Sequence, residues 1–262
     1  MSDFSDLRAR TLSALAMIAV GGLALWLGGG AMVALALVLA ALMGWELHRL
    51  MAPDAAQGRA EGAGLAAALL VAVFTLWQSG LVSLAGLALG AAVLAWNMPR
   101  QRLIFGLYLL MAMMAAHGLV VLRAGFGLAF VLWIVGIVVV SDIAGYFAGR
   151  LIGGPKFWPR VSPKKTWSGT VAGWIGAAFL GAGFAGALGL SWLIVPLSVV
   201  LSFAGQMGDI AESAIKRRAG VKDSSALIPG HGGVLDRFDA MIAVASLAWL
   251  MALAGLFSGM AR

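Results

Sequence analysis

Apolar stretches of about 20 residues recur along the whole sequence, separated by short polar segments. A helix of that length spans a bilayer, and only helices or closed barrels satisfy their backbone polar groups in lipid. The short alternating segments that are typical of membrane barrels are absent. Only 11% of the residues are charged, about half the share of a soluble domain. We therefore expect an all-α, polytopic integral membrane protein that contacts the lipid bilayer.

The apolar stretches predict nine spans, near residues 11–27, 31–47, 63–78, 80–96, 103–122, 126–147, 169–188, 190–207 and 238–257. Lys and Arg test this count, because they concentrate in cytoplasmic loops. With the N-terminus inside, 16 of the 18 basic residues fall on the inner side, and only Arg123 and Arg262 fall outside. The sequence thus predicts an inner-membrane protein with a cytoplasmic N-terminus and an external C-terminus.

The basic residues lie in the gaps between apolar stretches, so the net charge of +7 is a topology signal and no nucleic-acid partner is expected. The absence of cysteine excludes disulfides, thiolate metal sites and cysteine nucleophiles. We divide the chain into a variable transmembrane region, 1–125, for packing and lipid access, and a catalytic transmembrane region, 126–262, whose site faces the cytoplasm.

Acidic residues gather at the predicted inner face, where an unpaired carboxylate is costly and therefore a functional candidate. Seven of the eleven lie there: Glu46, Asp142, Asp209, Glu212, Asp223, Asp236 and Asp239. Glu46 follows an apolar span close to Arg49, and local pairing explains it. Asp209 ends the eighth span and Asp236 begins the ninth, so the loop between them can bring the two carboxylates together.

Carboxylate oxygens suit Mg²⁺, whose coordination is usually completed by substrate phosphates. Asp209 also shares a helical face with Glu212, Ser213 and Lys216, at spacings i, i+3, i+4 and i+7. A metal site and simple pairing of these acids with neighbouring bases both remain open from spacing alone.

Two further segments suit anions. "PGHGG" places Gly232 and Gly233 next to His231, and glycines let a backbone approach a phosphate closely. "SPKKTW" places Lys164 and Lys165 before the seventh span, with Ser162 and Thr166 as possible helix caps. The alternatives are an ordinary turn for the first segment, and a topology signal with a helix cap for the second.

The longest polar motif resembles a known signature. The run is Ser213-x-x-Lys216-Arg217-x-x-x-x-Lys222-Asp223, followed by Pro229-x-His231-Gly232-Gly233-x-x-Asp236-Arg237-x-Asp239. It resembles the signature of phosphatidate cytidylyltransferases, as do "SD…GYFAGR" around Ser141 and Asp142 and the "SPKKTW" segment. The resemblance covers roughly the last 120 residues. Ser168 stands where the family usually has Glu, which puts an acidic role at that position in doubt.

The resemblance implies that CTP and phosphatidic acid are converted to CDP-diacylglycerol and pyrophosphate with Mg²⁺, with a second cation such as K⁺ left open. It implies that Asp209 and Asp236 hold the metal, and a homodimer is the family-level expectation. The predicted catalytic residues are Asp209, Lys216, Lys222, Asp223, His231, Asp236 and Arg237. The predicted substrate-binding residues are Ser141, Asp142, Ser162, Lys164, Lys165, Thr166, Ser213, Arg217, Gly232, Gly233 and Asp239.

Within this interpretation the Lys and Arg residues neutralise phosphates, and His231 positions a substrate. Two alternatives remain. A CTP-dependent lipid kinase, or a synthase that uses another lipid phosphate, needs similar residues. A transporter also carries charges at span ends, but its site usually lies at the bilayer midplane between repeated halves. No such repeat is visible here, and the acidic residues cluster at one face.

Overall fold

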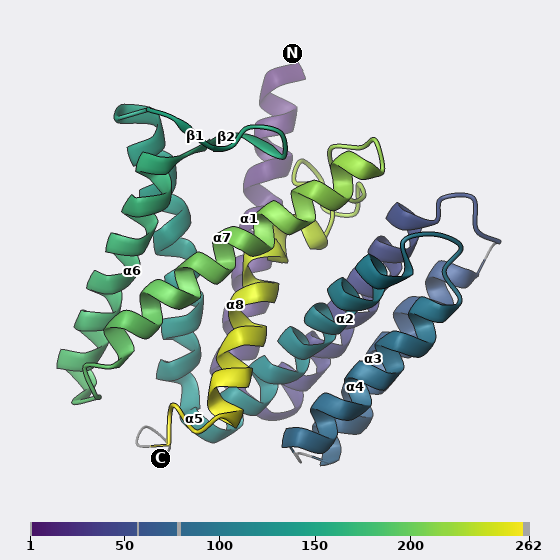
Figure 1. The fold of residues 1–262 in the computed structure, drawn as a ribbon, viewed down its shortest axis with the longest axis horizontal. Helices are drawn as coiled ribbons and strands as arrows, with labels where there is room; N and C mark the ends of the chain where they lie inside the picture. Colours follow the sequence, from purple (N-terminus) through teal and green to yellow (C-terminus); the bar gives the residue numbers. More distant parts are fainter. Residues whose placement is uncertain (1, 57, 78–79, 259–262) are drawn as a thin grey trace.

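The computed structural model describes residues 2–56, 58–77 and 80–258. The predicted break at Gln78 and Ser79, and Arg262 on the predicted outer side, fall outside these residues. The described chain consists of eight helices and one hairpin (Figure 1). The elements are α1 (Ser2–Leu27), α2 (Gly29–Met51), α3 (Arg59–Trp77), α4 (Gly80–Trp96), α5 (Arg102–Leu151), β1 (Lys156–Trp158), β2 (Ser162–Thr166), α6 (Trp167–Leu188), α7 (Ile194–Arg218) and α8 (Leu235–Leu253).

Helix α5 is broken in its middle. It has 50 residues, which would make a straight helix about 75 Å long, whereas the hydrocarbon core of a bilayer is about 30 Å thick. Gly127 has φ 85° and ψ −177°, a conformation that only glycine adopts readily, and the helix axis changes direction there (Figure 1). The two arms of α5 correspond to the predicted spans 103–122 and 126–147.

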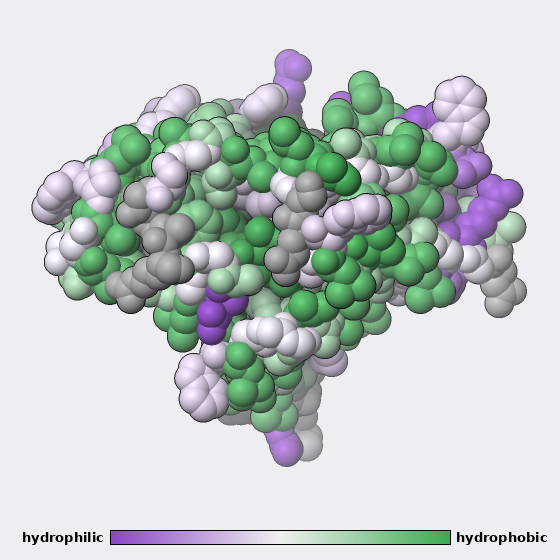
Figure 2. Space-filling model, turned by 90° about the horizontal axis from the view of Figure 1, so that it is seen from below, coloured by the Kyte–Doolittle hydropathy of each residue, from purple (hydrophilic) through white to green (hydrophobic). Residues whose placement is uncertain are grey.

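Six helices in the described chain are long and apolar enough to cross a membrane: α1 from Leu7, α2, α3, α5, α6 and α7. Helix α4 is apolar but has only 17 residues. Large apolar side chains point outward from these helices; Leu76 is 86% exposed and Phe179 is 75% exposed. Seen from the end that carries the C-terminus, the surface is mostly apolar (Figure 2). The chain is therefore a polytopic membrane protein whose exposed apolar surface suits lipid.

Small residues bring the helices of the C-terminal half close together, as is common in membranes. A Cβ added at Gly145 would lie 3.2 Å from the carbonyl oxygen of Gly169, so α5 and α6 nearly touch there. A Cβ at Gly208 would lie 2.6 Å from the carbonyl oxygen of Asp239, so α7 and α8 are equally close. These contacts draw the ends of α5, α6, α7 and α8 around one region.

The hairpin is a departure from the all-α expectation. β1 and β2 pair antiparallel between α5 and α6, with Lys156 opposite Thr166. The Trp167 N–H donates to the carbonyl of Pro155 at 3.0 Å, which joins the hairpin to α6. In Figure 1 the hairpin lies at the same end of the molecule as the α7–α8 loop and the N-terminus. The "SPKKT" strand and the "PGHGG" turn therefore lie at the same end of the molecule.

Candidate active site

The first cavity has a volume of about 510 Å³ and lies between α5, β2, α6 and α7. Its lining includes the predicted residues Ser141, Asp142, Lys164, Lys165 and Thr166, and it adds Gly145, Tyr146, Gly149, Arg150, Gly169, Thr170 and Gln206. The cavity therefore joins the motif near the end of α5 to the motif in β2. The cavity has three basic side chains, Arg150, Lys164 and Lys165, which suit a polyanionic ligand.

Lys165 ties this cavity to α7. Its Nζ lies 2.6 Å from Oδ2 of Asp209 and donates to the carbonyl of Gln206 at 3.3 Å. The Asp209 side chain is 31% exposed, so ligand can reach it. Thr166 caps α6 by accepting the Gly169 N–H at 3.2 Å, which confirms the predicted cap. Asp209 is thus the α7 carboxylate that faces the lysine-bearing strand.

Further along α7, Lys216 lies between the carboxylates of Glu212 on α7 and Asp236 on α8. Its Nζ is 2.6 Å from Oε2 of Glu212 and 2.6 Å from Oδ1 of Asp236. The Ser213 hydroxyl donates to Oδ1 of Asp209 at 3.3 Å. The predicted polar face of α7 is therefore present. Lys216 is already paired with protein carboxylates, so its phosphate-neutralising role stays a prediction.

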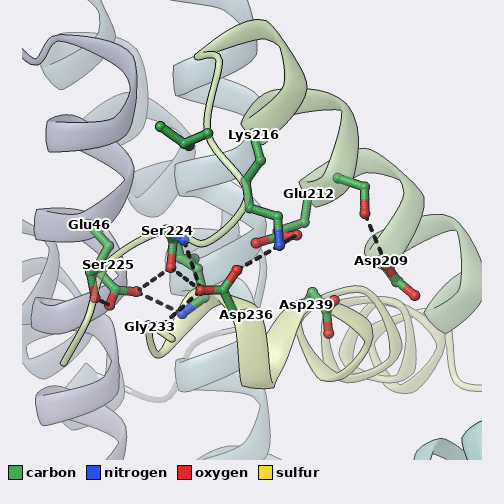
Figure 3. Close-up of polar contacts among 12 residues, drawn as sticks. Glu46, Asp209, Glu212, Lys216, Ser224, Ser225, Gly233, Asp236 and Asp239 are labelled. Carbon is green, nitrogen blue, oxygen red and sulfur yellow. Dashed lines mark hydrogen bonds and ion pairs between the residues drawn. The ribbon is translucent and has the colours of Figure 1, made fainter. Parts of the chain in front are cut away.

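Asp236 organises the loop before α8 (Figure 3). Its Oδ2 accepts hydrogen bonds from Ser224 N (2.8 Å), Ser224 Oγ (2.8 Å) and Gly233 N (2.7 Å). The side chain is only 2% exposed. The sequence predicted that backbone N–H groups of this glycine turn bind phosphate, but here the Gly233 N–H donates to Asp236. In this structure the glycine turn therefore binds a carboxylate of the protein itself.

Asp239 lies one turn further along α8 and is drawn between Asp236 and Asp209 in Figure 3. It accepts the N–H of Ala240 at 2.7 Å through Oδ1. The close approach of Gly208 to the Asp239 backbone explains why carboxylates of α7 and α8 come near one another.

The fit of these residues to Mg²⁺ differs from one carboxylate to the next. The described residues contain no group of three or more His, Cys, Asp or Glu side chains that could hold a metal by themselves. Mg²⁺ commonly needs only one or two carboxylates plus substrate phosphates. The partly exposed Asp209 fits that role. Asp236 is less available, because Lys216 contacts its Oδ1 and three loop donors contact its Oδ2, so the shared Asp209–Asp236 site stays a prediction.

A second cavity, of about 730 Å³, lies under the α7–α8 loop. Predicted residues in its lining are Lys222, Asp223, His231, Gly232 and Arg237, and the remainder are Arg10, Ser225, Ala226, Ile228, Pro229 and Gly230. The predicted residues therefore divide between two cavities, with the α7 and α8 acids between them. Ser162 lies in β2, and Arg217 donates to the carbonyl of Val221 at 3.2 Å at the exposed end of α7.

Helix α1 contributes to the second cavity, which sequence reasoning did not anticipate. Ser13 Oγ lies 2.8 Å from Nδ1 of His231 and 3.0 Å from the carbonyl of Pro229. Arg10, interpreted above only as a topology signal, lines the same cavity. No local pattern in α1 indicates these contacts, because they join residues more than 200 positions apart.

Glu46 is the other residue that sequence reasoning missed. Local pairing with Arg49 is the wrong explanation: the Arg49 guanidinium lies 5.0 Å from the centre of the Trp45 ring. Glu46 is fully buried and accepts hydrogen bonds from the loop before α8 and from the first turn of that helix. The available signal was a carboxylate at the inner end of an apolar span, where an unpaired charge is costly.

Known proteins are similar to this chain over most of its length. The model of the cytidylyltransferase family matches residues 8–254. A phosphatidate cytidylyltransferase of Brucella suis biovar 1 is 35% identical over 256 residues, which cover 94% of this chain and 93% of that protein. One of Staphylococcus saprophyticus is 42% identical over 127 residues, 46% of this chain and 48% of its own length. The likeness thus extends well beyond the last 120 residues, and the chain belongs to the cytidylyltransferase family.

Proposed function

We propose that this protein is a phosphatidate cytidylyltransferase, which makes CDP-diacylglycerol and pyrophosphate from CTP and phosphatidic acid. The observation that carries the proposal is the cavity of about 510 Å³ with Arg150, Lys164 and Lys165 in its lining, beside Asp209, in a membrane protein of this family. A lipid phosphate and a nucleotide triphosphate are both anionic, and they meet only at a membrane surface.

The reaction is a displacement at the α-phosphorus of CTP. A phosphate oxygen of phosphatidic acid forms the new P–O bond, and the bond from the α-phosphorus to the pyrophosphate oxygen breaks. A phosphate monoester has its second pKa near 6, so it is largely ionised at neutral pH without a strong general base. The protein therefore mainly has to position two anions and neutralise their charge.

The basic residues of the first cavity are suited to the triphosphate. In this structure Lys165 is neutralised by Asp209. Asp209, with Asp236 as the predicted partner, would hold Mg²⁺, which supplies charge neutralisation for the departing pyrophosphate. If Asp209 held the cation, Lys165 would be available to contact phosphate. The Lys165–Asp209 ion pair thus keeps both charges paired until a phosphate and a cation bind.

The membrane topology follows from the same elements. We propose nine spans with the site on the cytoplasmic face of the inner membrane, because the two arms of α5 and the seven other helices supply nine segments. The hairpin, the α7–α8 loop and the N-terminus lie at one end of the molecule (Figure 1). That end carries most of the basic loop residues, which favours the cytoplasmic side. The homodimer and the second cation remain expectations from the resemblance.

The position of a radioactive label separates this proposal from the lipid-kinase alternative. Purified protein is incubated with phosphatidic acid, Mg²⁺ and CTP labelled at the α- or the γ-phosphate. Cytidylyl transfer puts only the α-label into lipid, together with released pyrophosphate. A γ-label in lipid would identify a kinase, and no label in lipid from either CTP would refute cytidylyl transfer to phosphatidic acid.

A further inference from the structure

The N-terminal half of the chain reaches the candidate active site through one buried carboxylate. Glu46, on α2, is 0% exposed. It accepts hydrogen bonds from Ser225 Oγ at 2.6 Å, Leu235 N at 2.7 Å and Val234 N at 2.9 Å, and a longer one from Ser224 Oγ at 3.4 Å. We propose that Glu46 is a positioning residue that holds the α7–α8 loop and the first turn of α8 in the geometry that the reaction needs. This inference rests on the proposed function.

Helix α8 lacks a cap of its own. The first N–H groups of any helix have no partner within the helix, and a Ser, Thr, Asp or Asn side chain usually accepts one of them. Here the N-cap residue is Val234, which has no polar side chain, and no side-chain cap is present. Glu46 supplies the missing acceptor from another helix. Its negative charge also suits the positive end of the α8 dipole.

Glu46 and Asp236 hold the same loop from two sides (Figure 3). The Ser224 hydroxyl lies within hydrogen-bond distance of both, at 3.4 Å from Glu46 Oε2 and 2.8 Å from Asp236 Oδ2. Gly233 fits between them: its N–H donates to Asp236, and an added Cβ would collide with Ser224 Oγ and Glu46 Oε1. Movement of Glu46 therefore changes the donors that orient Asp236.

A carboxylate is specifically required at this position. A buried charge is expensive unless hydrogen bonds satisfy it, and the four donors around Glu46 are backbone or hydroxyl groups with no basic side chain among them. In Glu46→Gln, the new NH₂ group would face a backbone N–H or a serine hydroxyl instead of accepting from it. This substitution keeps the volume of the side chain and removes half of its accepting capacity.

The experiment compares Glu46→Gln with Glu61→Gln in the full-length purified enzyme. Glu61 is an exposed carboxylate in the first turn of α3 that accepts a hydrogen bond from Trp45 Nε1 at 3.3 Å and not from the α7–α8 loop, so it controls for charge loss. We expect Glu46→Gln to lower kcat by about tenfold or more, as for residues that orient metal ligands, with a small change in KM for CTP. Hydrogen exchange should speed up at the amides of Val234 and Leu235 but not along α2. Glu61→Gln should match the wild type in both measurements.

Two results for Glu46→Gln would overturn the proposal. One is a folded Glu46→Gln enzyme with wild-type kcat and wild-type exchange at residues 234–235. The other is less folded protein whose remaining enzyme has normal kcat, which would assign Glu46 a purely structural role. If Glu46→Gln does not fold, Ser225→Ala removes the 2.6 Å donor and leaves the carboxylate in place. Unchanged kcat and exchange in that variant would also overturn it. A wild-type protein that makes no CDP-diacylglycerol would refute the proposed function, whereas the exchange data would still test the loop contact.

Discussion

At the scale of single residues, the site is organised by carboxylates that already have partners. Asp209 is paired with Lys165, Asp236 with Lys216 and three loop donors, and Glu46 with the start of α8. Such pairing lowers the cost of placing charge near lipid. It also means that substrate and cation must compete with protein groups. Binding at this site would therefore replace ion pairs within the protein by contacts with the substrate and the cation.

The shared-metal prediction can be tested with Asp209→Asn, Asp236→Asn and the double variant. Two ligands of one ion act as a unit, so each single change should lower kcat by more than about tenfold and the double change should cost little more. Added Mg²⁺ should partly restore the single variants. Asp54→Asn, in the exposed α2–α3 loop, is the matched control. Additive losses, or near-normal turnover of either folded single variant at low Mg²⁺, would exclude a shared ion.

Gly233 should tolerate no side chain. In Gly233→Ala the added methyl group meets Ser224 Oγ and Glu46 Oε1, and such overpacking typically costs about 1–3 kcal/mol of stability. We expect a lower thermal midpoint in detergent and a fall in kcat. Gly183→Ala in α6 is the control, because nothing lies within 4 Å of its added Cβ. Equal behaviour of the two variants would show that the loop can relax around Gly233.

At the scale of elements, the β1–β2 hairpin presents two lysines to the first cavity and other basic residues to solvent. Lys164 and Lys165 line the cavity, whereas Lys156 and Arg160 are exposed and lie outside it. All four are close together on the same connection between α5 and α6. Lys156 and Arg160 therefore serve as a control. If the lysines of the cavity act only as a topology signal, removal of either pair of positive charges should have the same effect.

Replacement of both Lys164 and Lys165 by Gln should raise KM for CTP by about tenfold, the effect of losing roughly 1.4 kcal/mol of binding. The protein amount and its orientation should stay the same. Replacement of Lys156 and Arg160 by Gln removes the same charge from the hairpin and should leave CTP kinetics unchanged. The contrary result is a mixed orientation with normal KM in both double variants, which would assign the lysines to topology alone.

The polytopic helical architecture was predictable because lipid leaves few alternatives for an apolar stretch of 20 residues. Five residues of the first cavity were predictable, because motif positions close in sequence, such as Lys164 and Thr166, meet the end of α5; the other seven were not among the predicted site residues. The hairpin was not, since strands of three and five residues carry too little alternation to read. The Glu46 contacts were not predictable either, because they join residues 188 positions apart and depend on how α2 packs.

At the scale of the whole molecule, the break in α5 determines where every later segment lies. If both arms cross the membrane, the hairpin and the α7–α8 loop lie on the same side as the N-terminus, and the C-terminus lies opposite. If α5 crossed only once, the site would lie on the other side from the N-terminus. CTP is a cytoplasmic nucleotide, so the position of Gly127 in α5 bears directly on function.

The native chain has no cysteine, so single cysteines can report the side of each segment in intact cells. Cysteines in place of Asp54 and Ala226, both exposed, should react only with reagents that enter the cytoplasm. Cysteines at Ala124, next to the α5 break, and at Ser191, between α6 and α7, should react with a reagent that does not cross the membrane. Ala124 decides the point, because a single crossing by α5 would place this residue inside the bilayer and protect it. External labelling at Ala226, or protection at Ala124 in a folded and active protein, would contradict the nine-span arrangement.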